Sequence, residues 1–269
     1  MHQGWPKFVL SAAHLVPSEG PYGGAARLVV VSGFAPSVSV LPDGSNLTIL
    51  GEYPFSDNAT IVPSATMALR LRVPCWCERA HVRVGADGAW AEATPCGFHS
   101  IAPTSERVLV VFENELRLHT WCASNASGQG HIEGGGIEVH RGALLYALRP
   151  SSSVNESAVP GAPPGSPIRA RAVKVDTDSW NYALLPSSLR FESGAHPVPA
   201  VPFSSTASPP TRVLAKARRV PEWTSAGGAR GVGPVPRSPL SSAEPLEDIE
   251  LVPFGSTNVR ISVFPTLVE

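Results

Sequence analysis

The sequence is poor in charged residues and has no long apolar run. Asp, Glu, Lys and Arg make up 16 % of its 269 residues, whereas an ordinary soluble domain has about 25 %. The formal net charge of -1 gives no electrostatic reason to expect a nucleic acid or an acidic membrane as partner. A stretch of about 20 apolar residues, which a membrane-spanning helix needs, does not occur. The sequence therefore predicts no nucleic-acid partner and no membrane span.

The start of the sequence also lacks a secretory signal. The segment MHQGWPKFVLSAAHLVPSEG has neither a basic start nor a long apolar stretch. Four Asn-x-Ser/Thr sequons nevertheless occur among seven Asn residues, where chance predicts about one. Their asparagines are Asn46, Asn58, Asn125 and Asn155. This excess hints at a secretory route without fixing the localisation, and we expect the native N-terminus to lie upstream of Met1.

Cysteine is scarce as well, which excludes a disulfide-rich scaffold. The four cysteines are Cys75, Cys77, Cys96 and Cys122. Isolated thiols, one disulfide and a zinc site all stay open. In a strand, Cys75 and Cys77 would point to the same face, and a zinc site there would need two further ligands.

Proline and glycine are plentiful, with 28 and 24 residues, so helices would be interrupted often. The segment 66–73, TMALRLRV, instead alternates apolar and polar residues, which is typical of a half-buried antiparallel strand. We predict an all-β protein with two antiparallel β-sandwich domains, residues 1–132 and 133–269, and long Pro/Ser/Gly-rich loops. The run Gly134–Gly136 is interpreted as the joint between them.

Strand-like segments recur along the whole chain. Residues 137–148 form the longest of them, whereas 150–167 read as a mobile loop. The pattern of 211–219 fits a strand or a helix, and we predict a strand because Pro221 follows. Residues 249–252 and 258–264 should close the chain as a hairpin. The other predicted strands are 26–32, 47–50, 80–84, 107–112, 115–121, 169–175, 180–184 and 189–192.

Catalytic motifs are missing too. The sequence has no Gly-x-Ser-x-Gly elbow, no phosphate-binding Gly-rich loop and no His-Glu-x-x-His. A glycosidase needs two carboxylates at a set separation or a comparable nucleophile, but the acidic residues sit at strand ends and on polar faces, where we expect solvated surface charges. They are Glu52, Asp57, Glu113, Glu115, Glu138, Asp176 and Asp178. We therefore predict no catalytic, cofactor-binding or metal-binding residue in this chain.

Aromatic side chains provide one candidate binding feature. Sugar rings stack on exposed Trp and Tyr. Trp90 follows the turn at Asp87-Gly88 and is the candidate for an exposed carbohydrate platform. Packing within its loop is the alternative for Trp90, and Trp76, Trp180 and Trp223 are expected in the core or at a domain interface.

Several segments resemble one family, in the same order along the chain. RGALLYAL at 141–148 resembles RGPLVYAL, DSWNYAL at 178–184 resembles DWNYAL, and ARRVPEW at 217–223 matches ARRVPEW. LVPFGST at 251–257 is similar to LVPYGST, EYPF at 52–55 to a YPW segment, and LRLRVPCW at 69–76 to LRIPSW. Together they resemble glycoside hydrolase family 127, the β-L-arabinofuranosidase-like proteins, over nearly the whole chain.

The resemblance implies an accessory role. In that family an (α/α)6 barrel carries the chemistry, and β-sandwich domains follow it. Its nucleophile is a zinc-bound Cys in a Cys-Cys pair, which this sequence lacks, so zinc is expected only in a barrel outside this chain. Ala143 and Phe254 depart from the motifs, which hold Pro and Tyr there.

Three hypotheses follow. The first is a non-catalytic accessory region that buttresses a barrel of the same or a neighbouring polypeptide and is inactive alone. The second is a free-standing carbohydrate-binding module for arabinose-containing glycans. The third is a small metalloprotein built on Cys75 and Cys77.

Overall fold

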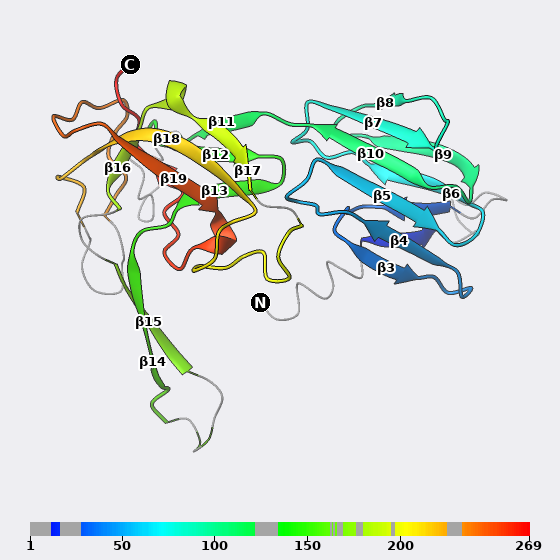
Figure 1. Cartoon of the computed structure of the whole chain (residues 1–269), viewed down its shortest axis with the longest axis horizontal. Coiled ribbons are helices and arrows are strands. Elements are labelled where there is room, and N and C mark those ends of the chain that lie inside the picture. The colour runs from blue at the N-terminus through cyan, green and yellow to red at the C-terminus, as the bar shows by residue number, and fades with distance from the viewer. Residues whose placement is uncertain are drawn as a thin grey trace. The chain divides into compact units, whose positions relative to one another are not determined.

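The computed structural model describes residues 12–16, 28–121, 134–161, 163, 165, 169–175, 180–194, 197–224 and 233–269. The chain divides into two compact units, Met1–Glu115 and Leu116–Glu269, which are described separately. The regular elements of the described part are strands and short 3-10 turns (Figure 1). This confirms the all-β prediction. No helix in that part is long and apolar enough to cross a membrane.

The first unit contains two sheets. A four-stranded sheet has the order β1 (Ala13–Val16), β2 (Leu28–Val31), β6 (Met67–Arg72), β9 (Phe98–Thr104). A six-stranded sheet has the order β3 (Ser37–Val40), β4 (Asn46–Leu50), β5 (Asn58–Pro63), β10 (Val108–Glu113), β7 (Arg79–Val84), β8 (Ala91–Ala93). The neighbours pair antiparallel except β2 and β6, which are parallel.

One core joins these two sheets into a sandwich. Leu69 and Leu71 of β6 and Val108 and Val110 of β10 are buried in the same hydrophobic cluster. The alternation that predicted the strand at 66–73 thus separates a core face from a solvent face, since Arg70 and Arg72 are exposed. Burying one face of each sheet in this way is what stabilises a sandwich.

The second unit is built on one eight-stranded sheet. Its main order is β11 (Leu116–Thr120), β12 (Ile137–Arg141), β13 (Leu144–Leu148), β19 (Glu247–Pro253), β18 (Thr211–Arg219), β16 (Tyr182–Leu184). β17 (Arg190–Ser193) also pairs with β18, and β20 (Val263–Phe264) with β12. β14 (Ser152–Ala158) and β15 (Arg169–Val175) form a separate two-stranded ribbon, and η1 (Pro186–Ser188) and η3 (Phe254–Ser256) are single 3-10 turns.

The C-terminal segment contacts two strands that are far apart in this sheet, β12 and the end strand β16. Phe264 is the register partner of Ile137 in β12. At the other end, the Leu184 N–H donates to the Pro265 carbonyl at 2.9 Å, and the Leu267 N–H donates to the Leu184 carbonyl at 2.8 Å. The predicted closing hairpin is therefore wrong: only residues 263–264 of the second segment form a strand, and they pair with β12 rather than β19.

Three further expectations are corrected. Residues 137–148 are two strands, because Gly142 has a φ of +55° and turns the chain between β12 and β13. The predicted loop 150–167 contains β14. β11 pairs with β12, so the division between the units falls after Glu115 and not at 132/133. Gly134–Gly136 accordingly lies inside the second unit, where the Trp121 N–H donates to the Gly136 carbonyl at 2.8 Å.

Candidate functional site

The two family-like motifs of the first unit meet in an aromatic cluster. Tyr53, from EYPF, stacks on Trp76, from LRLRVPCW, with ring centroids 6.1 Å apart. Phe112 meets the Trp76 ring edge-on at 5.1 Å, and Phe34 meets Phe112 at 5.0 Å. Burial raises the pKa of Tyr53 to about 12. The cluster packs against the core, so these motifs specify packing rather than an open site.

The motifs of the second unit also meet one another. Trp180, from DSWNYAL, packs edge-on against Trp223, from ARRVPEW, at 5.1 Å. Between them the Asn181 amide donates to the carbonyls of Val220 at 2.9 Å and Trp223 at 3.4 Å. Trp180, Asn181 and Trp223 are all buried. A buried amide with backbone partners fixes two segments against each other, so this clamp is structural.

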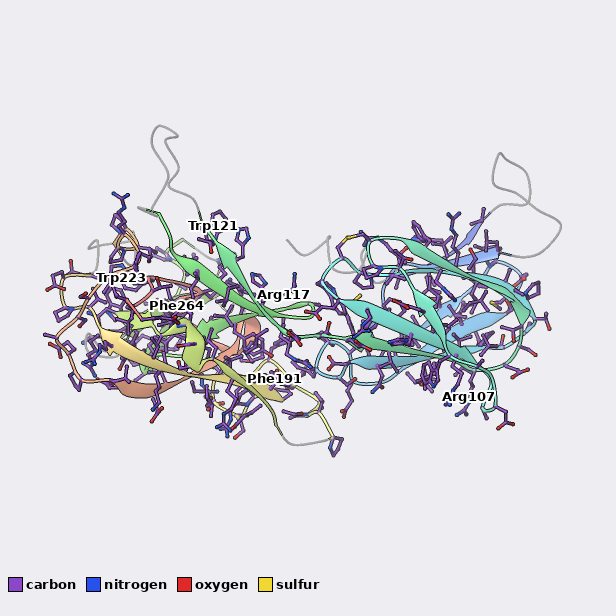
Figure 2. All side chains as sticks on the ribbon, turned by 90° about the horizontal axis from the view of Figure 1, so that it is seen from above. Arg107, Arg117, Trp121, Phe191, Trp223 and Phe264 are labelled. Carbon is purple, nitrogen blue, oxygen red and sulfur yellow. A yellow bond between two sulfur atoms is a disulfide. The ribbon has the colours of Figure 1, made fainter. Side chains whose placement is uncertain are left out.

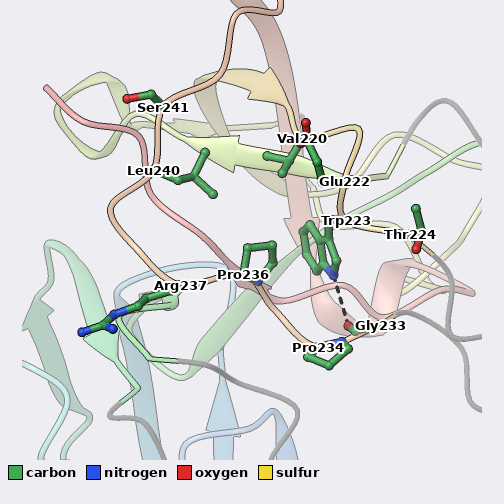
Figure 3. A pocket seen from close by; sticks show the side chains of 10 residues that line it. All are labelled: Val220, Glu222, Trp223, Thr224, Gly233, Pro234, Pro236, Arg237, Leu240 and Ser241. Carbon is green, nitrogen blue, oxygen red and sulfur yellow. Dashed lines mark hydrogen bonds between the residues drawn. The ribbon is translucent and has the colours of Figure 1, made fainter.

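A hollow of about 520 Å³ opens beside the clamp (Figure 3). Trp223 forms part of its wall but turns its indole N–H to the Gly233 carbonyl, 3.1 Å away. The charged side chains on its lining are Glu222 and Arg237. One carboxylate and one guanidinium do not supply the pair of acidic groups that glycoside hydrolysis requires.

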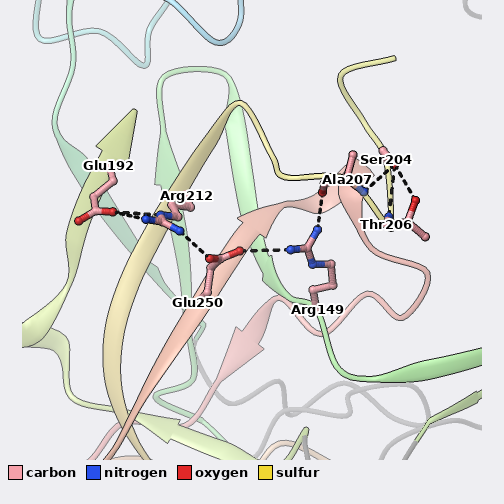
Figure 4. Close-up of polar contacts among 7 residues, drawn as sticks. All are labelled: Arg149, Glu192, Ser204, Thr206, Ala207, Arg212 and Glu250. Atoms are coloured by element: carbon pink, nitrogen blue, oxygen red, sulfur yellow. Dashed lines mark hydrogen bonds and ion pairs between the residues drawn. The ribbon is translucent and has the colours of Figure 1, made fainter. Parts of the chain in front are cut away.

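Carboxylates on the outer face of β17, β18 and β19 form a charge ladder. Arg212 holds Glu192 at 2.8 Å and Glu250 at 3.2 Å, and Glu250 also holds Arg149 at 3.3 Å (Figure 4). The hydrogen bond from Arg212 to Glu192, followed by that to Glu250, raises the pKa of Arg212. Cross-strand pairs of opposite charge stabilise a sheet. Glu192 and Glu250 therefore serve as ion-pair partners that stabilise the sheet.

Two of the acidic residues considered from the sequence are likewise paired with basic side chains rather than with a second carboxylate. In the first unit, Glu113 accepts from His81 at 2.8 Å and Arg79 at 2.9 Å. The His81 hydrogen bond, with Arg79 adding to it, lowers the pKa of Glu113, which is opposite to what a general acid needs. In the second unit, Glu138 pairs with His140 at 3.3 Å.

Three of the remaining acidic residues lie among the described residues, each in a different setting. Asp57 accepts from the Asn114 amide at 2.8 Å, Glu52 is half-buried and Glu115 is exposed. Asp176 and Asp178 lie outside the described residues.

The cysteines resolve into a disulfide and a buried thiol. Cys75 is bonded to Cys96 across 21 residues. Cys75 lies in a turn after Pro74 and Cys77 in the loop that follows, so neither cysteine lies in a strand. Cys77 is buried and directs its sulfur to the Pro74 carbonyl at 3.1 Å. Cys122 lies outside the described residues.

This arrangement does not fit a zinc site. The disulfide removes Cys75 and Cys96 from any set of metal ligands. In the part of the chain that the structure describes, no three His, Cys, Asp or Glu side chains gather around one point.

Trp90 lies just before β8, at the edge of the six-stranded sheet. Its side chain is 47 % exposed, as a stacking platform requires. The Arg83 guanidinium covers the ring, with its central carbon 4.8 Å from the centroid. This cation–π contact occupies ring surface that a sugar would need. The carbohydrate platform at Trp90 stays a prediction, and the ring area open to a sugar is smaller than its exposure suggests.

A second aromatic surface, on β11 and β12, is not among the sequence predictions. A hollow of about 680 Å³ is lined by Arg117, Leu118, His119, Glu138 and His140. His119 lies opposite Glu138 in the register, and Arg117 opposite His140. Trp121 continues β11 beyond His119, with the rings edge-on at 5.3 Å, and it is 40 % exposed (Figure 2).

We call this group the β11–β12 hollow. Its lining supplies hydrogen-bond donors and acceptors, and the exposed ring of Trp121 lies next to it rather than in its lining, a composition that suits a small polar ligand. The alternation of ELRLHTW contained the signal, because it places Arg117, His119 and Trp121 on one face. What the alternation could not supply was the pairing of β11 with β12.

Comparisons with known proteins bear on the fold. No protein-family model and no curated protein matches the chain. A solved structure described as a glycoside hydrolase matches with a TM-score of 0.51 and 15 % identity, over 95 % of this chain and 44 % of that one. The chain has the fold of part of a glycoside hydrolase. The predicted resemblance is thereby confirmed at the level of the fold.

Two other matches are family 127 enzymes. The β-L-arabinofuranosidase Ara127N of Geobacillus stearothermophilus T6 matches at 12 % identity and a TM-score of 0.43, over 91 % of this chain and 34 % of that one. A second family 127 β-arabinofuranosidase matches at 12 % identity and a TM-score of 0.41, over 89 % and 35 %. This chain spans less than half the length of each of the three matched chains.

Proposed function

We propose that this chain is the non-catalytic accessory β-sandwich region of a glycoside hydrolase family 127-like β-L-arabinofuranosidase. Its role is to buttress an (α/α)6 catalytic barrel that lies outside this chain. The observation that carries the proposal is that the family-like motifs pair with each other inside the fold, as Tyr53 does with Trp76 and Trp180 with Trp223. Motifs that serve packing are expected in a supporting domain.

The cysteine arrangement supports the same division of labour. The chemistry implied by the resemblance is that of a zinc-bound Cys, and the cysteines in the described residues do not fit such a site, since Cys75 and Cys96 are joined and Cys77 is buried. Zinc is therefore assigned to the proposed barrel.

The test combines the native polypeptide with the isolated chain. Antibodies against residues 1–269 purify the native protein from its source cells, and peptide mapping reads its full length and its associated chains. We expect a mainly helical region with a Cys-Cys pair, and hydrolysis of an aryl β-L-arabinofuranoside by the native protein. The isolated chain should release no aryl alcohol. A native protein without such a region, or turnover by the isolated chain, overturns the proposal.

A carbohydrate-binding module is the second candidate, and the β11–β12 hollow favours it. Exposed Trp121 offers a ring face or edge to a sugar, while His119, Glu138 and His140 offer hydrogen bonds. Titration calorimetry with arabino-oligosaccharides tests this function. Binding that is lost in Trp121→Ala but kept in Trp90→Ala assigns it to the hollow, and the reverse pattern assigns it to Trp90. No binding by the unaltered chain removes this candidate.

A further inference from the structure

The outer face of the six-stranded sheet exposes apolar side chains. Val38 and Val40 of β3 are 62 % and 75 % exposed, and Leu50 of β4 is 45 % exposed. β3 is the edge strand of this sheet. An apolar edge that remains uncovered is a site for association with another chain, so something should cover it.

Two sequons lie on the same face. Asn46 and Thr48 alternate with buried Leu47 and Ile49, and Asn58 and Thr60 alternate with buried Ala59 and Ile61; the buried members point to the core. The sequon residues therefore point outward. In the first sequon, Asn46 is the register partner of Val40, and Thr48 of Val38. In the second, Thr60 is the register partner of Leu50.

The two asparagines are well separated on this face. Leu50 lies opposite Thr60, so Asn58 stands about six register positions from Asn46, or roughly 20 Å at about 3.3 Å per residue. Asn58 is exposed and Asn46 half-buried. Neither side-chain amide takes part in a hydrogen bond within the described part of the chain. Each side-chain amide is thus free, with exposed Val40 opposite Asn46 and exposed Leu50 opposite Thr60 of the second sequon.

The disulfide of the first unit points, like the sequons, to the secretory pathway. Cys75 and Cys96 form a disulfide on this unit. Disulfides form and persist mainly in oxidising compartments, above all the secretory pathway. The sequons are read in that same pathway, because it contains the enzyme that glycosylates Asn-x-Ser/Thr.

We propose that Asn46 and Asn58 carry N-linked glycans that cover the apolar outer face of the six-stranded sheet. The donor is an oligosaccharide linked through pyrophosphate to a lipid. The Nδ2 of each asparagine forms a bond to the anomeric carbon of the first sugar and loses a proton. The bond from that carbon to the pyrophosphate oxygen breaks, and the lipid pyrophosphate leaves.

This modification has a consequence for the surroundings of the unit. A face that carries two glycans is hydrated and cannot pack against a protein domain. Any surface of the first unit that supports a partner must then lie elsewhere. The proposal does not depend on the accessory function, because a free-standing module could carry the same glycans.

The native protein provides the first test. It is treated with peptide N-glycosidase in H2(18)O, which converts each modified asparagine into an 18O-labelled aspartate, and is mapped by mass spectrometry. We expect the label at both Asn46 and Asn58. An unlabelled Asn46 or Asn58 overturns the proposal, and so does a glycan found only at Asn155.

Variant chains, secreted from eukaryotic cells behind a cleavable signal, provide the second test. Thr48→Val and Thr60→Val destroy one sequon each with nearly unchanged side-chain volume, whereas Thr48→Ser and Thr60→Ser keep the sequon. Each Val variant should lose one glycan step in gel mobility, and each Ser variant none. Equal mobility of all variants overturns the proposal.

Covering of the apolar face is read from association. The chain with Asn46→Gln and Asn58→Gln, which lacks both glycans but adds no apolar side chain, should bind a hydrophobic dye at least twofold more strongly and should self-associate in sedimentation. Adding Val40→Thr should reverse much of this gain by removing the most exposed of the apolar side chains. Unchanged dye binding in the glycan-free chain refutes the covering role even where both sites are occupied.

Discussion

Truncation of Phe264 tests whether the C-terminal segment belongs to the core of the second unit. Phe264 is fully buried although β20 contains only two residues. It pairs with Ile137 of β12, while the following residues pair with Leu184 of β16. In Phe264→Ala, the segment should lose contacts that hold β12 and β16 together.

The expected loss is large. Phe→Ala in a packed core costs about 3–5 kcal/mol, because both the transfer free energy and the cavity count. The free energy of unfolding of a domain is about 5–15 kcal/mol in total, so the substitution should remove a large part of it. With a urea dependence of about 2 kcal/mol per M, the midpoint should fall by about 2 M. Val268→Ala is the matched control: Val268 is in the same segment but 57 % exposed, and its loss should stay within about 0.5 kcal/mol.

Hydrogen exchange in urea, followed by mass spectrometry, separates the two units. Peptides from β18 should lose protection at lower urea in Phe264→Ala, whereas peptides from β6 should keep the wild-type midpoint, because the two units have separate cores. Three outcomes would refute the reasoning. They are an unchanged β18 midpoint, an equal shift in β6 and β18, and a Val268→Ala effect as large as that of Phe264→Ala.

Three further predictions concern single contacts. Burial raises the pKa of Tyr53 from 10.0 to about 12. The protonated hydroxyl should therefore contribute about 2–3 kcal/mol to the free energy of unfolding below pH 10, and this contribution should be lost as pH rises towards 12. Unfolding curves of Tyr53→Phe across this range should lack that loss. Replacing Cys75 and Cys96 with Ser opens a loop of 21 residues and should lower stability by about 3 kcal/mol, measured in urea against the oxidised chain. Tyr146→Phe leaves buried Thr211 without its hydroxyl partner at 2.9 Å and should cost about 1–2 kcal/mol by thermal unfolding.

Periodicity predicts those strands whose two faces differ. Residues 66–73 and 211–219 alternate because one face contacts a core and the other contacts water, so β6 and β18 lie where the pattern places them. β20 is out of reach, because two residues cannot show a period. The run 137–148 resembles one strand because polar residues do not recur at every second position through it, so no break in the pattern marks its turn. Gly142 is nevertheless a usable turn signal.

Contacts between distant segments cannot be predicted in the same way. Three interpretations of the cysteines are open from the sequence because it does not say which turns meet, and the fold brings Cys75 to Cys96. The hollow next to Trp121 depends on the pairing of β11 with β12, across residues that include the Gly134–Gly136 run. The turn before Trp90 identifies it as a candidate, but its cover by Arg83 depends on the approach of β7 to β8.

The surfaces of the described chain differ in what they can support. On β17–β19 the charged groups satisfy one another, as in the ladder of Arg212 with Glu192 and Glu250, and burying such pairs against a partner would cost their hydration. The proposed glycans would keep the outer face of the six-stranded sheet in water.

The β11–β12 hollow differs from both surfaces, because the exposed ring of Trp121 lies next to its charged groups and it carries no sequon. Trp121 beside it is exposed, and its lining contains both basic and acidic side chains, so a protein partner and a sugar would compete for the same residues. The two candidate functions thus exclude each other at this surface. Chemical oxidation of Trp121 in the native protein distinguishes them: protection that arabino-oligosaccharides do not alter indicates a docked domain, whereas protection that appears only on adding the sugar indicates a binding module.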